Sequence, residues 1–452
     1  MTQSSANFSF LRYCLGCKAD LSIVVAKIDW RQLYTFASKQ AVLGICFDGI
    51  KRLGEVYPEE LKRNPIERNL LMTWMGKAQQ IRRQNMKVNA VASKLYSMFR
   101  EDGLRCCILK GQGNALMYPN VYSRNPGDID VWVNASREQI TEYVKKHFEI
   151  GNDIRFQHLE TAVDGVPVEL HFFPCSMNNP LYHTRLQKWF KRNADLQCSN
   201  VVSLPDGIGE IAIPTTAFNV VYQLTHLYHH FFDEGVGMRQ IIDYYVVMDD
   251  FWKVKESFSQ PSRPSLPKEG STAFPKPLSP QGTGDVTALR CSEPLRYKDG
   301  GASKPSPNCA GWDRLGMEGD SSATSCSSTA VASSSFAVTL EVIQRDLKHL
   351  GLWKFAGAVM YVLHEALELS EEKMIVPMDE KRGKLLLAEI LNGGNFGQHF
   401  TMYGHFTQQG MAKKYFLKIW RNMHFVRYFP AEALCEPIFR TWHFFWRMKN
   451  HK

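Results

Sequence analysis

Two aspartates separated by one residue are the strongest candidates for chemistry in this sequence. Asp128 and Asp130 lie in the run Asp-Ile-Asp-Val-Trp-Val, where acidic and apolar residues alternate. Side chains two positions apart in a strand point to the same face, so the two carboxylates are expected about 6–7 Å apart. Because like charges repel at that separation, the pattern predicts a bound Mg²⁺ (or Mn²⁺), a hard cation that carboxylates hold together with substrate phosphates.

A third carboxylate follows in the run Val-Pro-Val-Glu-Leu-His-Phe-Phe, where Glu169 is surrounded by apolar residues. An unpaired carboxylate is costly in such a setting. If this segment packs beside the aspartate strand, Glu169 joins the metal site, either as a ligand or as the base that deprotonates an acceptor hydroxyl. The alternative is a buried Glu paired with a nearby Arg or Lys. His171 alternates onto the same face as Glu169 and is a candidate to support it.

Glycines and basic residues near the aspartates are candidates for phosphate binding. Gly127 directly precedes the pair and allows close approach of the backbone to a ligand. The turn that contains Lys110, Gly111 and Gly113 is rich in glycine, and backbone amides in such turns can cradle phosphate. Lys110 would add a point charge and Arg124 a bidentate contact. The alternative for Lys110 is a solvated lysine at the end of a strand.

The segments around these residues alternate between short strands and one helix. The expected order is a strand at 106–111, a helical piece at 115–117, a strand at 128–133, a helix at 136–147 with Ser136 as N-cap, and strands at 155–163 and 166–173. An Asp-Gly turn at 164–165 between two alternating runs is a strong hairpin signal. The order predicts a small mixed sheet of the α+β or α/β class.

Helical patterns flank this core on both sides, and one low-complexity stretch interrupts them. The expected regions are a helical 1–100, the core at 101–213, a helical 214–254, a disordered insertion at 255–335 and a helical 336–452. Residues 255–335 contain 17 Ser, 9 Pro and 8 Gly, which is 34 of 81 residues. This fraction exceeds the ~25–30% typical of low-complexity chain. Few aliphatic residues remain to offset the entropy of ordering.

The C-terminal residues 411–452 combine basic and aromatic side chains. They hold nine Lys or Arg, two Glu and eleven aromatic residues. Such a segment could bind RNA, with aromatics stacking on bases, or lie on an anionic membrane. We favour a third interpretation, an amphipathic helical subdomain with aromatics inward and basic residues outward.

Overall composition narrows the class of protein. The net charge of +9 over 452 residues is modest and does not by itself indicate nucleic-acid binding. No run of 18 or more apolar residues occurs, and the first residues lack the basic and apolar regions of a signal peptide. The eleven cysteines are scattered without the spacing of a disulfide framework. These features predict a cytoplasmic protein without a transmembrane segment.

The text LKGQGNALMYPNVYSRNPGDIDVWV (109–133), followed by VELH (168–171), resembles the polymerase β-type nucleotidyltransferase superfamily. More narrowly, it is similar to a bacterial family of largely uncharacterised nucleotidyltransferases. The resemblance covers most of the chain except 255–335. It implies metal-dependent transfer of a nucleoside monophosphate from a nucleoside triphosphate such as ATP to an acceptor, with release of pyrophosphate. Asp128, Asp130 and Glu169 would be the catalytic, metal-binding residues. The acceptor stays open between a small molecule, a protein hydroxyl and an RNA end.

One departure from the superfamily affects the phosphate site. The superfamily has a Gly-Ser pair before the aspartates, whereas the turn here reads Lys-Gly-Gln-Gly at 110–113. The missing serine motivates an alternative function, a catalytically degenerate scaffold that binds a nucleotide or a protein partner. Further along, His226, His229 and His230 are expected to be structural or to line the acceptor cleft. Arg239 and Asp243, four apart on a helix, are expected to form an ion pair, with a phosphate contact by Arg239 as the alternative.

Overall fold

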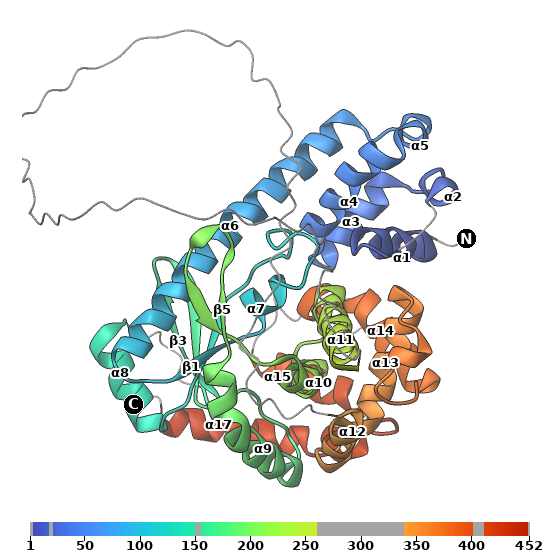
Figure 1. Cartoon of the computed structure of the whole chain (residues 1–452). Helices are drawn as coiled ribbons and strands as arrows, with labels where there is room; N and C mark the ends of the chain where they lie inside the picture. Colours follow the sequence, from blue (N-terminus) through green and yellow to red (C-terminus); the bar gives the residue numbers. More distant parts are fainter. Residues whose placement is uncertain (1–2, 18–20, 150–154, 260–338, 401–410, 451–452) are drawn as a thin grey trace, which may run out of the picture. The chain divides into compact units, whose positions relative to one another are not determined.

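The computed structural model describes residues 3–17, 21–149, 155–259, 339–400 and 411–450 (Figure 1). All of these residues belong to a single unit of the chain, formed by residues 1–260 and 330–452. The described part is mostly helical and contains one small mixed sheet. The predicted fold class is therefore confirmed.

The sheet has four strands in the order β1-β2-β4-β3. Their bounds are β1 Cys106–Leu109, β2 Ile129–Val133, β3 His158–Val163 and β4 Val166–His171. Strands β1 and β3 run antiparallel to their neighbours, whereas β2 and β4 pair in parallel. The parallel register places Asp130 opposite Glu169. The hairpin thus packs beside the aspartate strand, which is the arrangement that the third carboxylate required.

Local sequence signals explain the connections between these strands. Asp164 and Gly165 have φ angles of 51° and 72°, the left-handed backbone that a two-residue hairpin turn needs. Helix α8 (Arg137–His147) begins after Ser136, whose Oγ accepts a hydrogen bond from the Gln139 backbone N–H. The Gln139 side chain accepts from Ser136 N–H in return, which completes a capping box. Helix α7 (Gly111–Ala115) begins earlier than the predicted helical piece.

The two faces of the sheet have different partners. Val131 and Leu170 point to a face that packs against Val88 and Leu95 of α6 (Arg68–Glu101) and against α8. Because side chains alternate along a strand, Asp130 and Glu169 point to the opposite face. The sheet therefore keeps its apolar core on one side and its candidate chemistry on the other.

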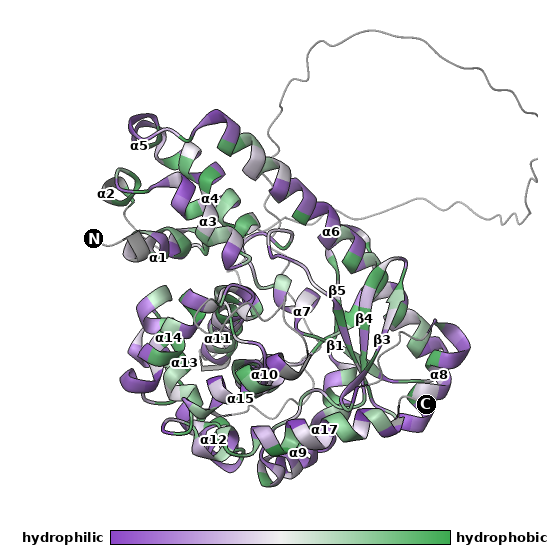
Figure 2. Cartoon of the chain, turned by 180° about the vertical axis from the view of Figure 1, so that it is seen from behind, coloured by the Kyte–Doolittle hydropathy of each residue, from purple (hydrophilic) through white to green (hydrophobic). Residues whose placement is uncertain are grey.

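Helices build the rest of the described structure. The N-terminal helices are α1 Gln3–Cys14, α2 Ser22–Val25, α3 Trp30–Lys39, α4 Leu43–Val56 and α5 Pro58–Arg63. After the sheet follow α9 Pro180–Ser199, the hairpin β5 Val201–Ser203 and β6 Glu210–Ala212, α10 Thr216–Asp233, α11 Met238–Ser259, α12 Leu340–His349, α13 Trp353–Leu367, α14 Glu380–Gly393, α15 Met411–Met423, α16 Pro430–Ala433 and α17 Glu436–Asn450. Figure 2 shows α10 and the sheet strands as largely hydrophobic, whereas α6 alternates, as expected for a helix buried along one face.

The structure adds detail to three expectations about the helical regions. The periodic pattern that resumes at 340 is broken into α12 and α13 around Gly351, which has a φ of 73°. Helix α11 continues to Ser259, past the expected start of the insertion, and residues 260–335 of that insertion lie outside the described residues. Among the described helices, none is long and apolar enough to cross a bilayer.

Leu170→Ala is expected to lower the free energy of unfolding by about 2–5 kcal/mol, because it leaves a cavity in the core beneath the site. Leu170 is fully buried, whereas Leu181 on α9 is 57% exposed. The matched substitution Leu181→Ala is therefore expected to change stability by less than about 0.5 kcal/mol. Urea unfolding followed by circular dichroism measures both. Equal effects at the two positions would contradict the described burial.

Candidate metal and nucleotide site

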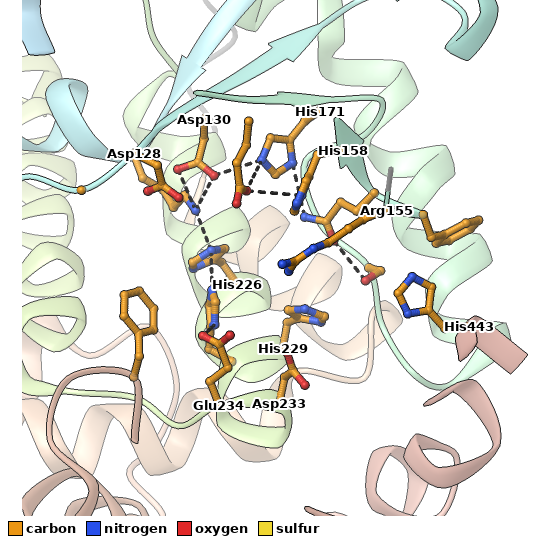
Figure 3. A pocket seen from close by; sticks show the side chains of 18 of the residues that line it. Asp128, Asp130, Arg155, His158, His171, His226, His229, Asp233, Glu234 and His443 are labelled. Atoms are coloured by element: carbon orange, nitrogen blue, oxygen red, sulfur yellow. Dashed lines mark hydrogen bonds and ion pairs between the residues drawn. The ribbon is translucent and has the colours of Figure 1, made fainter. Parts of the chain in front are cut away.

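A cavity of about 690 Å³ opens over the polar face of β2 and β4 (Figure 3). Its sheet wall includes Lys110, Gly127, Asp128, Asp130 and Glu169. Facing them, α10 contributes His226, His229, His230 and Asp233, and α17 contributes Glu436, Phe439, Arg440 and His443. The cavity thus brings together five of the eight predicted site residues.

Two of the three carboxylates, Asp130 and Glu169, share one supporting side chain. His171 Nε2 lies 3.0 Å from Asp130 Oδ1 and 3.3 Å from Glu169 Oε2. The Gln157 amide contacts the other ring nitrogen, His171 Nδ1, at 3.3 Å. A fixed imidazole that faces two carboxylates holds both in place, which agrees with the supporting role expected for His171.

Lys110 contacts the same cluster of side chains. Its Nζ lies 3.1 Å from both carboxylate oxygens of Asp130 and donates to His226 Nε2 at 2.6 Å. Its side chain is only 16% exposed, so the alternative of a solvated lysine is wrong. Burial, the Lys110 ammonium and His230 lower the pKa of His226 well below its usual value. His226 is therefore neutral and accepts the lysine's hydrogen bond.

The carboxylates differ in how their charges are balanced. Burial would raise the pKa of Asp130, but Lys110 and His171 outweigh burial and hold it below its usual range. Burial likewise opposes ionisation of Glu169, and the hydrogen bond from His171 lowers its pKa. For His171, burial is outweighed by its hydrogen bonds to Asp130 and Glu169, which raise its pKa to about 9.

Asp128 is compensated less fully, because the Lys110 charge does not outweigh the effects that raise its pKa. Burial, together with the charges of Asp130 and Glu169, raises its pKa to about 6. The site therefore carries a surplus of negative charge on oxygen atoms, next to a cavity large enough for a ligand. This donor set fits a divalent cation such as Mg²⁺, which prefers carboxylate oxygens and keeps room for phosphate.

The predicted ion pair between Arg239 and Asp243 is wrong. Asp243 instead receives two hydrogen bonds from Arg124, at 2.7 and 2.8 Å, and one from the Tyr118 hydroxyl at 2.6 Å. Arg124 was expected to contact phosphate, but this buried pairing occupies its guanidinium. The local i, i+4 spacing missed a partner 119 residues away.

Arg239 is consequently better placed than Arg124 to contact a phosphate. It is 8% exposed, lines the cavity and donates to the Asn125 carbonyl at 3.2 Å. Its Nε is buried without a hydrogen-bond partner. Its Nη1 is also the atom nearest to where a side chain on Gly127 would begin, at 3.9 Å. Arg239 can therefore reach a phosphate bound next to Asp128.

The predicted glycines have separate roles. Gly111 and Arg124 line a small recess that shares Lys110 and Asp128 with the main cavity. Gly113 does not line either space. A Cβ on Gly113 would lie 3.0 Å from Ile213 Cγ2, so this glycine permits close packing of α7.

Sequence reasoning missed several residues of the cavity, among them His158. His158 on β3 is 7% exposed and pairs in register with His171. The alternation along β3 places it on the polar face, and that signal was present in the sequence. It would have required knowing that β3 lies directly beside β4.

The C-terminal helices only partly follow the preferred interpretation of that segment. Phe425 and Phe429 are buried as expected. Trp442, Phe444 and Phe445 on α17 are exposed, which contradicts an inward orientation of all the aromatics. Trp442 nevertheless keeps an edge-on contact with Phe156, with the ring centroids 5.0 Å apart.

Comparison with known proteins supports one family. Residues 26–257, slightly more than half of the chain, match the family described as uncharacterised nucleotidyltransferase. No match was found among curated proteins. Among solved structures, the crystal structure of an antigenic nucleotidyltransferase-like protein from Paracoccidioides brasiliensis is similar at 16% identity. That match covers 36% of this chain and 75% of the other, and its TM-score of 0.25 is too low to support an argument here.

Lys110→Gly is expected to be more stable than Lys110→Ala by about 1–2 kcal/mol, because Lys110 has a positive φ, which is strained for any residue with a Cβ. The angles are φ 52° and ψ −130°. Both variants lose the ammonium beside Asp130, so their difference isolates the backbone term. Urea unfolding of the pair measures it, and an alanine variant as stable as the glycine variant would contradict the strain.

Proposed function

Because the chain belongs to the uncharacterised nucleotidyltransferase family, we propose that it transfers a nucleoside monophosphate from a nucleoside triphosphate to an acceptor, with release of pyrophosphate. One observation carries the proposal. Asp130 and Glu169 are direct register partners on parallel strands, and Asp128 lines the same cavity. Three carboxylates on one wall of a cavity are suited to metal-assisted phosphoryl chemistry.

Asp128, Asp130 and Glu169 would hold Mg²⁺ (or Mn²⁺). When bound, the ion would offset the charge of the triphosphate and of the leaving pyrophosphate. Lys110 and His171 keep Asp130 ionised and in place before any ligand arrives. A preorganised site avoids the cost of gathering like charges during the reaction.

Arg239 and Lys110 would bind the phosphates. They reach the space beside Gly127 and Asp128 from different elements, α11 and the end of β1. Two cations on different sides of a polyphosphate fix its orientation as well as its charge. The Arg239 guanidinium, which has an unsatisfied donor, would compensate for the missing serine of the superfamily turn.

The acceptor would approach from the α10 and α17 wall. That wall offers His229, Asp233, Glu234 and His443 alongside Phe439, so it is polar with an aromatic border. Such a lining suits a hydroxyl-bearing polar acceptor better than an apolar one. Glu169 faces this space and would accept the proton of the attacking hydroxyl when it is not itself a metal ligand.

A second candidate function is a non-catalytic scaffold that binds a nucleotide or a partner protein. The observation in its favour is that Lys110, the expected phosphate ligand, is already paired with Asp130 and His226. Nucleotide binding without turnover in the presence of metal and of candidate acceptors would support this function.

The double variant Asp128→Asn and Asp130→Asn is expected to lose metal-dependent nucleotide binding by about 10-fold or more, because it removes two anionic ligands. Calorimetric titration with ATP, GTP, CTP and UTP, with Mg²⁺ and with chelator, measures the binding. Glu59→Gln is the matched control, because its side chain is 65% exposed and pairs only with Lys62 on the surface. If the unmodified protein binds no triphosphate in the presence of Mg²⁺ or Mn²⁺, the proposal is wrong.

A further inference from the structure

Two imidazoles and one carboxylate converge at the edge of the cavity formed by the β3–β4 hairpin (Figure 3). His158 Nδ1 lies 3.3 Å from Glu169 Oε2, and His171 Nε2 lies 3.3 Å from the same oxygen. One potential ligand atom of each of the three residues lies within 4.8 Å of the others. The spacing is that of donors around a shared point.

His158 has no hydrogen-bond partner for either ring nitrogen, although it is 93% buried with a residual exposure of 7%. The nearest carboxylate oxygens, on Glu169 and Glu160, lie at 3.3 and 3.6 Å without forming hydrogen bonds. A buried polar atom without a partner carries a desolvation cost. A ligand at the shared point would satisfy it.

We propose that His158, Glu169 and His171 form a binding site for a divalent transition-metal ion beside the Asp128–Asp130 pair. Two imidazole nitrogens and one carboxylate oxygen suit Mn²⁺, Co²⁺ or Zn²⁺, whereas Mg²⁺ strongly prefers oxygen ligands. The ion takes the place of the proton that His171 Nε2 shares with Asp130 and Glu169, and that proton passes to solvent. Gln157 holds the far side of the His171 ring.

This inference rests on the proposed function only in that Glu169 serves both metal positions. It adds a second metal position, at which the hairpin supplies nitrogen ligands that the aspartates lack. The role of His158 is specific to this arrangement, since its register partner is His171 itself.

The test is a titration of the full-length protein with Co²⁺ in the absence of nucleotide, followed by the visible absorption of the bound ion and by competition with Zn²⁺. His158→Ala is expected to weaken Co²⁺ binding by about 10-fold or more, the usual cost of removing a residue that supports a metal site. His158→Gln, which keeps a polar side chain, is a second variant in case alanine disturbs the hairpin. His147→Ala, at an exposed position on α8, is the matched control.

Asp128→Asn removes a ligand of the aspartate pair but no nitrogen ligand, so the visible absorption of histidine-bound Co²⁺ is expected to persist in this variant. Co²⁺ binding that His158→Ala and His158→Gln both leave intact would overturn the proposal, as would the absence of Co²⁺ binding to the unmodified protein. Nucleotide binding is measured separately. If the unmodified protein binds Co²⁺ at this site but binds no nucleotide, only the proposed function is rejected.

A second inference rests on a different part of the chain, the apolar surface of α15 and α17. Eight large side chains there are between 44% and 71% exposed: Phe416, Trp420 and Met423 on α15, and Ile438, Trp442, Phe444, Phe445 and Met448 on α17. The two helices are linked by a hydrogen bond between the hydroxyls of Tyr415 and Thr441. Exposed apolar patches of this extent indicate an interaction surface.

The exposed charges that the described segment 411–450 contributes to this α15–α17 surface have one sign. The acidic residues of the described segment 411–450, Glu432 and Glu436, are 1% and 2% exposed. Lys413, Arg427 and Lys449 are exposed. Because every exposed charge in this segment is basic, a second copy of the same surface would meet it with like charges.

We infer that the α15–α17 surface docks on an anionic lipid bilayer. Tryptophan and phenylalanine on the apolar side of an amphipathic helix enter the headgroup region, while flanking basic residues attract anionic lipids. This mode of binding places helices on the bilayer and does not require a helix that crosses it.

The test is co-sedimentation with phosphatidylcholine vesicles that contain or lack phosphatidylglycerol. The unmodified protein is expected to sediment with the anionic vesicles. The double variant Trp442→Ser and Phe445→Ser is expected to bind them at least about 10-fold more weakly. Met72→Ser is the matched control, because Met72 is 55% exposed on α6.

Equal binding by the double variant, or no binding of the unmodified protein to anionic vesicles, would overturn this inference. Single-stranded RNA and the mass of the protein in solution are measured in parallel. RNA binding or dimerisation that the double variant loses, without vesicle binding, would assign the surface to RNA or to a second copy instead.

Discussion

A single buried carboxylate, that of Asp130, organises the structure around the cavity. Burying an isolated charge is prohibitively costly unless cationic or hydrogen-bonding groups surround it. Lys110 from the end of β1 and His171 from β4 meet this requirement from opposite sides. The central strand is thereby tied to both of its neighbours through side chains as well as through the backbone ladder.

The same constraint reaches beyond the sheet. Lys110 also donates to His226, so the charge balance of Asp130 ties helix α10 to the site. The loop that leads into Asp128 is fixed separately, because the bidentate contact of Arg124 with Asp243 joins it to α11. Breaking one partner of such a buried pair leaves an uncompensated charge, which is strongly destabilising.

These pairings leave two groups of the cavity available for a ligand. The pKa of Asp128 stays raised because the Lys110 charge only partly offsets burial and the neighbouring carboxylates, and Arg239 Nε is buried without an acceptor. They have opposite signs and lie on the same side of the cavity, beside Gly127. A metal ion bound with a polyphosphate would complement both, which is the physical reason that nucleotide binding fits this site.

The sequence by itself determined the features that depend on local periodicity and local backbone chemistry. Alternation placed Asp128 and Asp130 on one face, the Asp-Gly turn produced the β3–β4 hairpin, and Ser136 with Gln139 capped α8. Each of these follows from residues within a few positions of one another. The match to the nucleotidyltransferase family, over residues 26–257, likewise comes from the sequence.

Only the tertiary structure determined which charged and polar side chains pair with one another. Asp243 pairs with Arg124 rather than with Arg239, Lys110 faces Asp130 and His226, and His158 lies beside Glu169. The outward aromatics of α17 belong with these cases, because a helical pattern does not show which side another element covers. Such partners are far apart in the sequence, and burial of charge selects among them only once the elements are packed together.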